Sequence, residues 1–158
     1  MSSNHFAAIS MKFQKNKKIF ASLVFITMVA SLPACGDGRP RRVPVSGTVL
    51  IDGKPLKYGT VRFYTEGGRP ATGRLDKQGR FTLGCFEEND GVPTGTHPVT
   101  VDAAEALAED TVRWHAPKKY ASQTTSPLTQ KIDGPTDSLK IELHWENKRG
   151  PFTEKTGG

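Results

Sequence analysis

Short runs in which every second residue is apolar, separated by turn residues, constrain the fold of this chain more than any other feature. The clearest run is SLKIELHWE, whose apolar positions are Leu139, Ile141, Leu143 and Trp145. Such alternation places successive side chains on opposite faces of a strand. Similar runs occur at residues 43–51, 59–65, 71–75, 80–86 and 91–101. The pattern predicts an all-β fold, an antiparallel sandwich of six to seven short strands.

Turn residues and composition agree with this prediction. Asp52-Gly53 is a strong hairpin signal, and the runs EGGRP and DKQG mark two further turns. With 158 residues the chain is expected to hold one domain, and 16 glycines and 11 prolines suit a turn-rich β protein. We place that domain at residues 43–147 and expect a disordered tail at residues 148–158.

The segment from Ala103 to Pro127 lacks the alternation. Its first part, Ala103–Asp110, consists of good helix formers and is predicted to form a short helix, followed by a long irregular loop. This loop combines aromatic and basic residues that are common in contacts with proteins or glycans. The candidate partner-contact residues are Arg113, Trp114, Lys118, Lys119 and Tyr120. The alternative is that the loop packs on its own sandwich.

The N-terminal segment is typical of an export signal. From Met11, an alternative start of the chain, four lysines precede an apolar run of 14 residues, Ile19–Leu32. As a helix this run would be about 21 Å long, short of the roughly 30 Å hydrocarbon core of a bilayer. Residues 1–34 are therefore predicted to be a signal peptide rather than a permanent membrane span.

The end of that segment resembles the lipobox of bacterial lipoproteins. Leu32, Pro33 and Ala34 precede Cys35, which would become the first mature residue. The resemblance implies that the Cys35 sulfur receives a diacylglyceryl group and that its amine is acylated after cleavage. Residues 35–42 would form a lipidated tether, and the exported protein would be anchored to the cell membrane or the outer membrane. An ordinary secretory signal before an unmodified cysteine is the alternative.

The domain itself resembles a known family. The motifs VSGTV, DGKPL, LDKQGRF and PTGTHPVTV, between Val45 and Val101, resemble those of the carboxypeptidase regulatory-like domain. The later PKKY stretch is similar to the tail of small bacterial lipoproteins built on it. The resemblance implies a transthyretin-like (prealbumin-like) Greek-key β-sandwich. These motifs describe a fold and its turns, and they imply no particular activity.

Charge and the reactive residues indicate little chemistry. Four of the 22 basic residues lie in the first 34 residues, which contain no acid, so 18 basic and 16 acidic residues remain. This near balance argues against a nucleic-acid partner. His97, His115 and His144 stand apart without metal-ligand spacing, and the acidic loop Glu87–Gly91 lacks a calcium-loop pattern. No metal, cofactor or catalytic residue is predicted.

The expected function is therefore that of a cell-envelope lipoprotein that presents a non-catalytic β-sandwich. Its partners would be the lipid bilayer, through acylated Cys35, and an envelope protein or glycan. A carbohydrate- or peptide-binding accessory domain is the alternative. A small transthyretin-like hydrolase is a third, but the chain ends without the Tyr-Arg-Gly-Ser sequence of that enzyme family. Cys85 shares the parity of Phe81 and Leu83, so we expect a buried free thiol.

Overall fold

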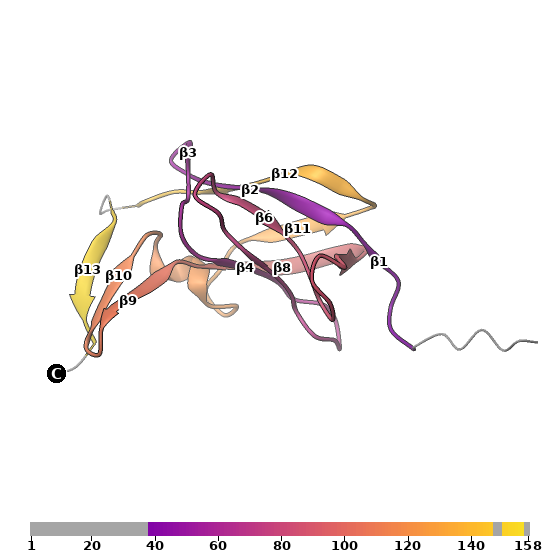
Figure 1. Cartoon of the computed structure of the whole chain (residues 1–158), viewed down its shortest axis with the longest axis horizontal. Coiled ribbons are helices and arrows are strands. Elements are labelled where there is room, and N and C mark those ends of the chain that lie inside the picture. The colour runs from indigo at the N-terminus through magenta and orange to yellow at the C-terminus, as the bar shows by residue number, and fades with distance from the viewer. Residues whose placement is uncertain (1–37, 147–149, 157–158) are drawn as a thin grey trace, which may run out of the picture. The chain divides into compact units, whose positions relative to one another are not determined.

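Each alternating run forms a strand, or part of one, in the computed structural model, which describes residues 38–146 and 150–156 (Figure 1). The described chain is almost entirely β, as predicted. Two four-stranded sheets carry the core. The first contains β12 (Thr136–Leu143), β2 (Val45–Ile51) and β3 (Lys54–Pro55) in that order, with β6 (Arg80–Thr82) also paired to β2. The second has the order β11 (Thr129–Ile132), β8 (Gly95–Asp102), β4 (Thr60–Phe63) and β5 (Ala71–Arg74).

The core lies between the inward faces of these two sheets. Phe63 of β4 and Phe81 of β6 face each other with ring centroids 6.5 Å apart. The fully buried residues around them come from β2, β4, β8, β12 and the chain just after β6, and include Val45, Val49, Val61, Leu83, Val99, Val101, Ile141 and Leu143. Each is an inward position of an alternating run, so burial of these apolar side chains explains why the strands form.

One ladder differs from the prediction of a wholly antiparallel sandwich. Strand β12 runs parallel to β2, with Leu139 opposite Gly47 and Leu143 opposite Ile51. Parallel pairing needs a long connection, and here 84 residues of sequence, 52–135, separate the two strands. Alternation reveals the faces of a strand but not the direction of its neighbour.

The first part of the segment predicted as a helix and loop is instead a β-hairpin. Strands β9 (Ala104–Ala108) and β10 (Thr111–Trp114) pair antiparallel. Residues 115–127 contain no strand, as predicted for the loop, and include the 3-10 turn η2 (Lys118–Ala121), which is the only helical piece in the described residues. Strand β10 is central in a three-stranded sheet, so its backbone is paired on both sides. This tertiary pairing overrides the helix propensity of Ala103–Asp110.

The predicted disordered tail is also corrected. Within residues 148–158, Phe152–Lys155 forms strand β13, which pairs antiparallel with β10. Trp114 lies opposite Phe152 in that register. The tail is ordered there because it supplies the third strand that the hairpin needs on its other side.

The turn signals are confirmed in detail at the β2–β3 hairpin. Asp52 and Gly53 have φ angles of 46° and 75°, and Ile51 pairs with Lys54 on either side of them. Two successive positive φ angles define the tight turn that matches strand twist, which Asp-Gly accommodates well. Near the N-terminal end, β1 (Arg42–Val43) pairs with β7 (Val92–Pro93), which begins the folded domain.

Candidate functional site

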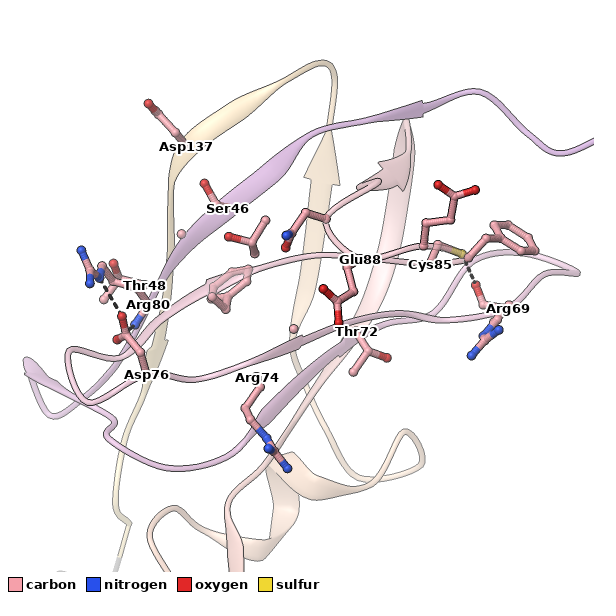
Figure 2. A pocket seen from close by; sticks show the side chains of 18 residues that line it. Ser46, Thr48, Arg69, Thr72, Arg74, Asp76, Arg80, Cys85, Glu88 and Asp137 are labelled. Carbon is pink, nitrogen blue, oxygen red and sulfur yellow. Dashed lines mark hydrogen bonds and ion pairs between the residues drawn. The ribbon is translucent and has the colours of Figure 1, made fainter.

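A polar concavity lies on the outward side of β2, β6 and β5. This outer groove of about 840 Å³ is shown in Figure 2. Strand alternation directs hydroxyl and guanidinium groups into it, from Ser46, Thr48, Thr72, Arg74, Arg80 and Thr82. Its floor requires close approach of β5 and β6: a Cβ on Gly73 would lie 2.7 Å from the Thr82 carbonyl oxygen. A glycine there is what lets the two sheets meet at this edge.

An ordered turn forms one end of the outer groove. The Asp76 carboxylate accepts hydrogen bonds from the backbone amides of Gln78 (2.8 Å) and Arg80 (2.9 Å), and its second oxygen pairs with Arg80 Nε at 2.8 Å. The Arg80 amide is the largest cause of a lowered pKa for Asp76. The carboxylate therefore stabilises the turn and is already occupied by groups of its own loop.

Cys85, at the other end, behaves as predicted. Its side chain is free and buried, with 6% of the residue exposed, and its Sγ donates to the Arg69 carbonyl oxygen at 3.1 Å. Burial, with the nearby Asp90 carboxylate, raises the pKa of the thiol. A protonated, buried thiol is a poor nucleophile. No histidine is among the described residues that line this groove.

The acidic loop Glu87–Gly91 borders the same groove, and Asp90 organises it. Its carboxylate accepts from the amides of Cys85 (2.6 Å), Phe86 (3.2 Å) and Glu87 (3.2 Å) and lies 2.9 Å from Arg42 Nε. Burial alone would raise the pKa of Asp90, but these donors and Arg42 lower it overall. Within residues 38–146 and 150–156, no three acidic, histidine or cysteine side chains are grouped as metal ligands.

A second concavity, the end groove, lies between the β2–β3 turn and the chain after β12. Its volume is about 890 Å³, and its lining includes Asp52, Lys54, Lys57, His115, Trp145 and Glu146. Trp145 is held edge-on by Phe152, with ring centroids 6.0 Å apart. The His115 ring lies 5.1 Å from the Tyr58 ring, and its Nε2 is 2.8 Å from Glu105 Oε2. An indole and an imidazole beside charged groups suit a polar ligand with an apolar face.

The candidate partner-contact residues are divided among three places. Trp114 Nε1 donates to Glu154 Oε1 at 2.9 Å, and Lys118 Nζ lies 2.5 Å from the same oxygen. Lys118 also lies 5.3 Å from the centroid of the Trp114 ring. The hydrogen bond from Lys118 is the largest cause of a lowered pKa for Glu154, followed by the hydrogen bond from Trp114. The structure thus joins Trp114 and Lys118 through β13.

The other three residues have separate partners. Lys119 forms an ion pair with Glu146, which raises the pKa of Lys119, and its Nζ lies 4.8 Å from the Tyr120 ring centroid. Tyr120 is 4% exposed and therefore belongs to the core. Arg113 Nη1 is 3.9 Å from a Glu105 oxygen across the hairpin. These contacts favour the alternative reading, in which the segment packs on its own domain.

The three histidines with described surroundings have no partner in common. The two ring nitrogens of His97, a buried residue, lie 3.2 Å from the Tyr64 carbonyl oxygen and 2.8 Å from that of Pro93. His115 contacts Glu105, and His144 Nδ1 lies 3.4 Å from Asp52 Oδ1. A His–acid pair at a surface is also a common structural contact, so neither pair by itself indicates catalysis.

Sequence reasoning missed both grooves. The alternation in the sequence shows that the side chains of Ser46, Thr48, Arg80 and Thr82 point outward from their strands. That these side chains lie around one groove depends on the pairing of β2 with β6, which the alternation does not reveal. The lipobox residues Leu32, Pro33 and Ala34 and the lipidation residue Cys35 lie outside the described residues. In the part of the chain that the structure describes, no helix has the length and apolar character needed to cross a bilayer.

Comparison with known proteins adds no relationship to this geometry. No family model matches the chain, and neither a curated protein nor a solved structure shows significant similarity to it.

Proposed function

We propose that the chain is a cell-envelope lipoprotein, anchored through lipid on Cys35, that presents a non-catalytic transthyretin-like β-sandwich. The observation that carries this proposal is the position of Cys35. It follows a basic segment and an apolar run too short to remain as a span, and it precedes the first strand, β1, by only seven residues. A tether of that length extends at most about 25 Å.

Attachment of the first strand supports the same reading. Arg42 of β1 pairs with Asp90, and its guanidinium lies 4.9 Å from the centroid of the Phe86 ring. The folded domain therefore begins directly at the end of the tether. Two or more acyl chains would hold it at the bilayer firmly, because each buried methylene contributes about 0.8 kcal/mol.

Intact mass of the full-length gene product, purified from membranes of its bacterial host, tests the anchor. The expected mass corresponds to residues 35–158 with a diacylglyceryl and an acyl group on residue 35. A Cys35→Ser variant should retain residues 1–34 or lose membrane association. Cys85→Ser is the matched control and should be lipidated as the unsubstituted chain is. Equal palmitate labelling of the Cys35→Ser variant would refute the anchor.

Ligand binding in the end groove is the second candidate function. The half-buried Trp145, held by Phe152, offers an indole next to the charged groups of Lys54, Lys57 and Glu146. Glycans and short peptides bind such combinations through stacking and hydrogen bonds. A glycan array and a peptide array probed with the protein test this. Binding that Trp145→Ala removes, and that the outer-groove variant Thr72→Ala leaves unchanged, would place the ligand there.

A further inference from the structure

Strand β12 has an unpaired edge. In the described residues it pairs only with β2, although it is eight residues long. The edge strands β11 and β13 have four residues each, and β3 has two, one of which is Pro55. Short length, proline, β-bulges and charged side chains are the usual means by which proteins protect sheet edges from pairing. Strand β12 is long and contains no proline, and its register irregularity is confined to the start of the strand, between Thr136 and Leu139. Its regular part, residues 139–143, carries one exposed residue of each charge, Lys140 and Glu142.

The direction of the backbone groups along β12 follows from one hydrogen bond. The Asp52 amide donates to the Leu143 carbonyl oxygen at 2.9 Å, so the backbone of Leu143 faces β2. Backbone direction alternates along a strand, so the backbone of Ile141 also faces β2. The amides and carbonyls of Lys140 and Glu142 therefore point to the open edge, and both side chains are exposed to solvent.

We propose that this edge pairs antiparallel with the same edge of a second copy of the chain, with the two-fold axis at Ile141. In that register Lys140 lies opposite Glu142 of the second copy, and Glu142 lies opposite Lys140 of the second copy. Residues opposite each other with outward backbones exchange both hydrogen bonds of the pair. The same two pairs bring opposite charges together on the solvent face.

Charge selects this register over its neighbours. If the two-fold axis passes through residue 140 instead, Lys140 lies opposite Lys140 of the second copy. If it passes through residue 142, Glu142 lies opposite Glu142 of the second copy. Like charges directly across a ladder are destabilising. A two-fold interface is self-complementary by necessity, and the Lys-Ile-Glu order of residues 140–142 has this property in one antiparallel register.

The apolar residues of β12 and the contacts at its C-terminal end are consistent with a short ladder between the two copies. Leu139 is only partly buried, and the register places it opposite Leu143 of the second copy, which extends the core row across the axis. Beyond Glu142, the next outward amide belongs to His144 and donates to the Tyr120 hydroxyl at 3.3 Å. The open edge therefore ends where Tyr120 occupies it.

Charge reversal tests the proposal in the full-length chain, purified in detergent and examined by sedimentation velocity. The unsubstituted protein is expected to dimerise. Lys140→Glu alone, or Glu142→Lys alone, turns two attractive pairs into repulsive ones and should weaken dimerisation about 30-fold. The double variant Lys140→Glu with Glu142→Lys restores opposite charges and should restore the dimer. Circular dichroism verifies that each variant is folded.

A second measurement reads the register directly. Chains carrying Lys140→Cys are mixed with chains carrying Glu142→Cys and are oxidised. In the proposed register, residue 140 lies opposite residue 142 of the second copy, and hydrogen-bonded partners have Cα atoms about 5.5 Å apart, within disulfide range. The two copies of residue 140 are offset from each other by two residues along the strand, and so are the two copies of residue 142, which makes a disulfide between like positions unfavourable. The mixed disulfide should exceed either homodisulfide, and the unsubstituted chain sets the background. Any one of four results would overturn the proposal. In the charge-reversal experiment, these are a monomeric unsubstituted protein, a dimer that persists in both single variants, or a double variant that stays monomeric. In the cysteine experiment, it is a yield of mixed disulfide no higher than the background.

Discussion

Trp114 Nε1 donates a hydrogen bond of 2.9 Å to Glu154 Oε1, although the two residues are 40 positions apart in the chain. Trp114 lies on β10 and Glu154 on β13, and Lys118 of η2 reaches the same carboxylate oxygen. One acid therefore links the hairpin, the 3-10 turn and the C-terminal strand. Removing that carboxylate is expected to loosen all three together.

Replacement of Glu154 by Gln tests this link. The amide retains an acceptor for Trp114 but loses the charge that pairs with Lys118, so β13 should open more often. Hydrogen exchange of the β13 amides is expected to be about fivefold faster than in the parent chain. Lys155→Gln is the matched control, because Lys155 lies 4.0 Å from Asp110 and is highly exposed. Exchange of the β13 amides at the same rate in Glu154→Gln as in the parent chain would show that the ion pair with Lys118 is not needed to hold β13 in place.

Asp90 is expected to contribute to global stability because four donors converge on it. Asp90→Ala leaves the amides of Cys85, Phe86 and Glu87 without their acceptor, at a cost of about 2 kcal/mol in the free energy of unfolding. Urea unfolding measures this cost. Asp133→Ala is the control, since that carboxylate is 76% exposed and forms an ion pair with the exposed Lys131. A cost for Asp90→Ala no larger than for Asp133→Ala would contradict the assignment.

The pH dependence of this contribution has a definite sign. The pKa of Asp90 is below its ordinary value of 3.8 in the folded chain. The folded state therefore binds its proton less readily than the unfolded state, and the stabilisation is fully present above pH 3.8. It is lost as the pH falls below that value, through the folded pKa. The difference in unfolding free energy between the parent and Asp90→Asn should shrink over that acidic range, and a difference that grew on acidification would refute the sign.

Gly73 is expected to tolerate no side chain. Its Cβ would approach the Thr82 carbonyl oxygen to 2.7 Å and the Phe81 Cβ to 3.2 Å. Gly73→Ala should therefore lower the free energy of unfolding by about 2 kcal/mol, because backbone of β6 has to move. Gly134→Ala is the control, as no atom lies within 4 Å of the added methyl. Urea unfolding of the two variants compares them directly; equal midpoints would mean that β5 and β6 separate easily.

Cys85 is expected to react slowly with alkylating agents in the folded protein. The thiol is buried, its pKa is raised, and it donates to the Arg69 carbonyl. Iodoacetamide labelling, measured on the peptide that contains Cys85, should be at least about tenfold slower without denaturant than in urea. Rapid labelling of the folded protein would show that the outer groove opens at this end.

Parts of this structure follow from local sequence alone. The apolar parity of Leu139, Ile141 and Leu143 specifies which side chains face the core, because a strand has a side-chain period of two. Asp52-Gly53 specifies a tight turn, because its backbone needs two positive φ angles. The all-β class and the burial of Cys85 rest on the same short-range rules, and the structure confirms them.

Tertiary structure decided what depends on contacts between distant segments. Ala104–Ala108 has the composition of a helix and is a strand, because β10 offers it a ladder and Phe152–Lys155 completes the sheet from the far side. The parallel direction of β12 likewise joins residues far apart in the chain. Strands β5 and β6 are close in sequence, but they belong to different sheets, so their approach also depends on the tertiary structure. Local preferences amount to a few tenths of a kcal/mol per residue, whereas pairing and burial act on whole strands. Both grooves and the open edge of β12 exist only once those strands have met.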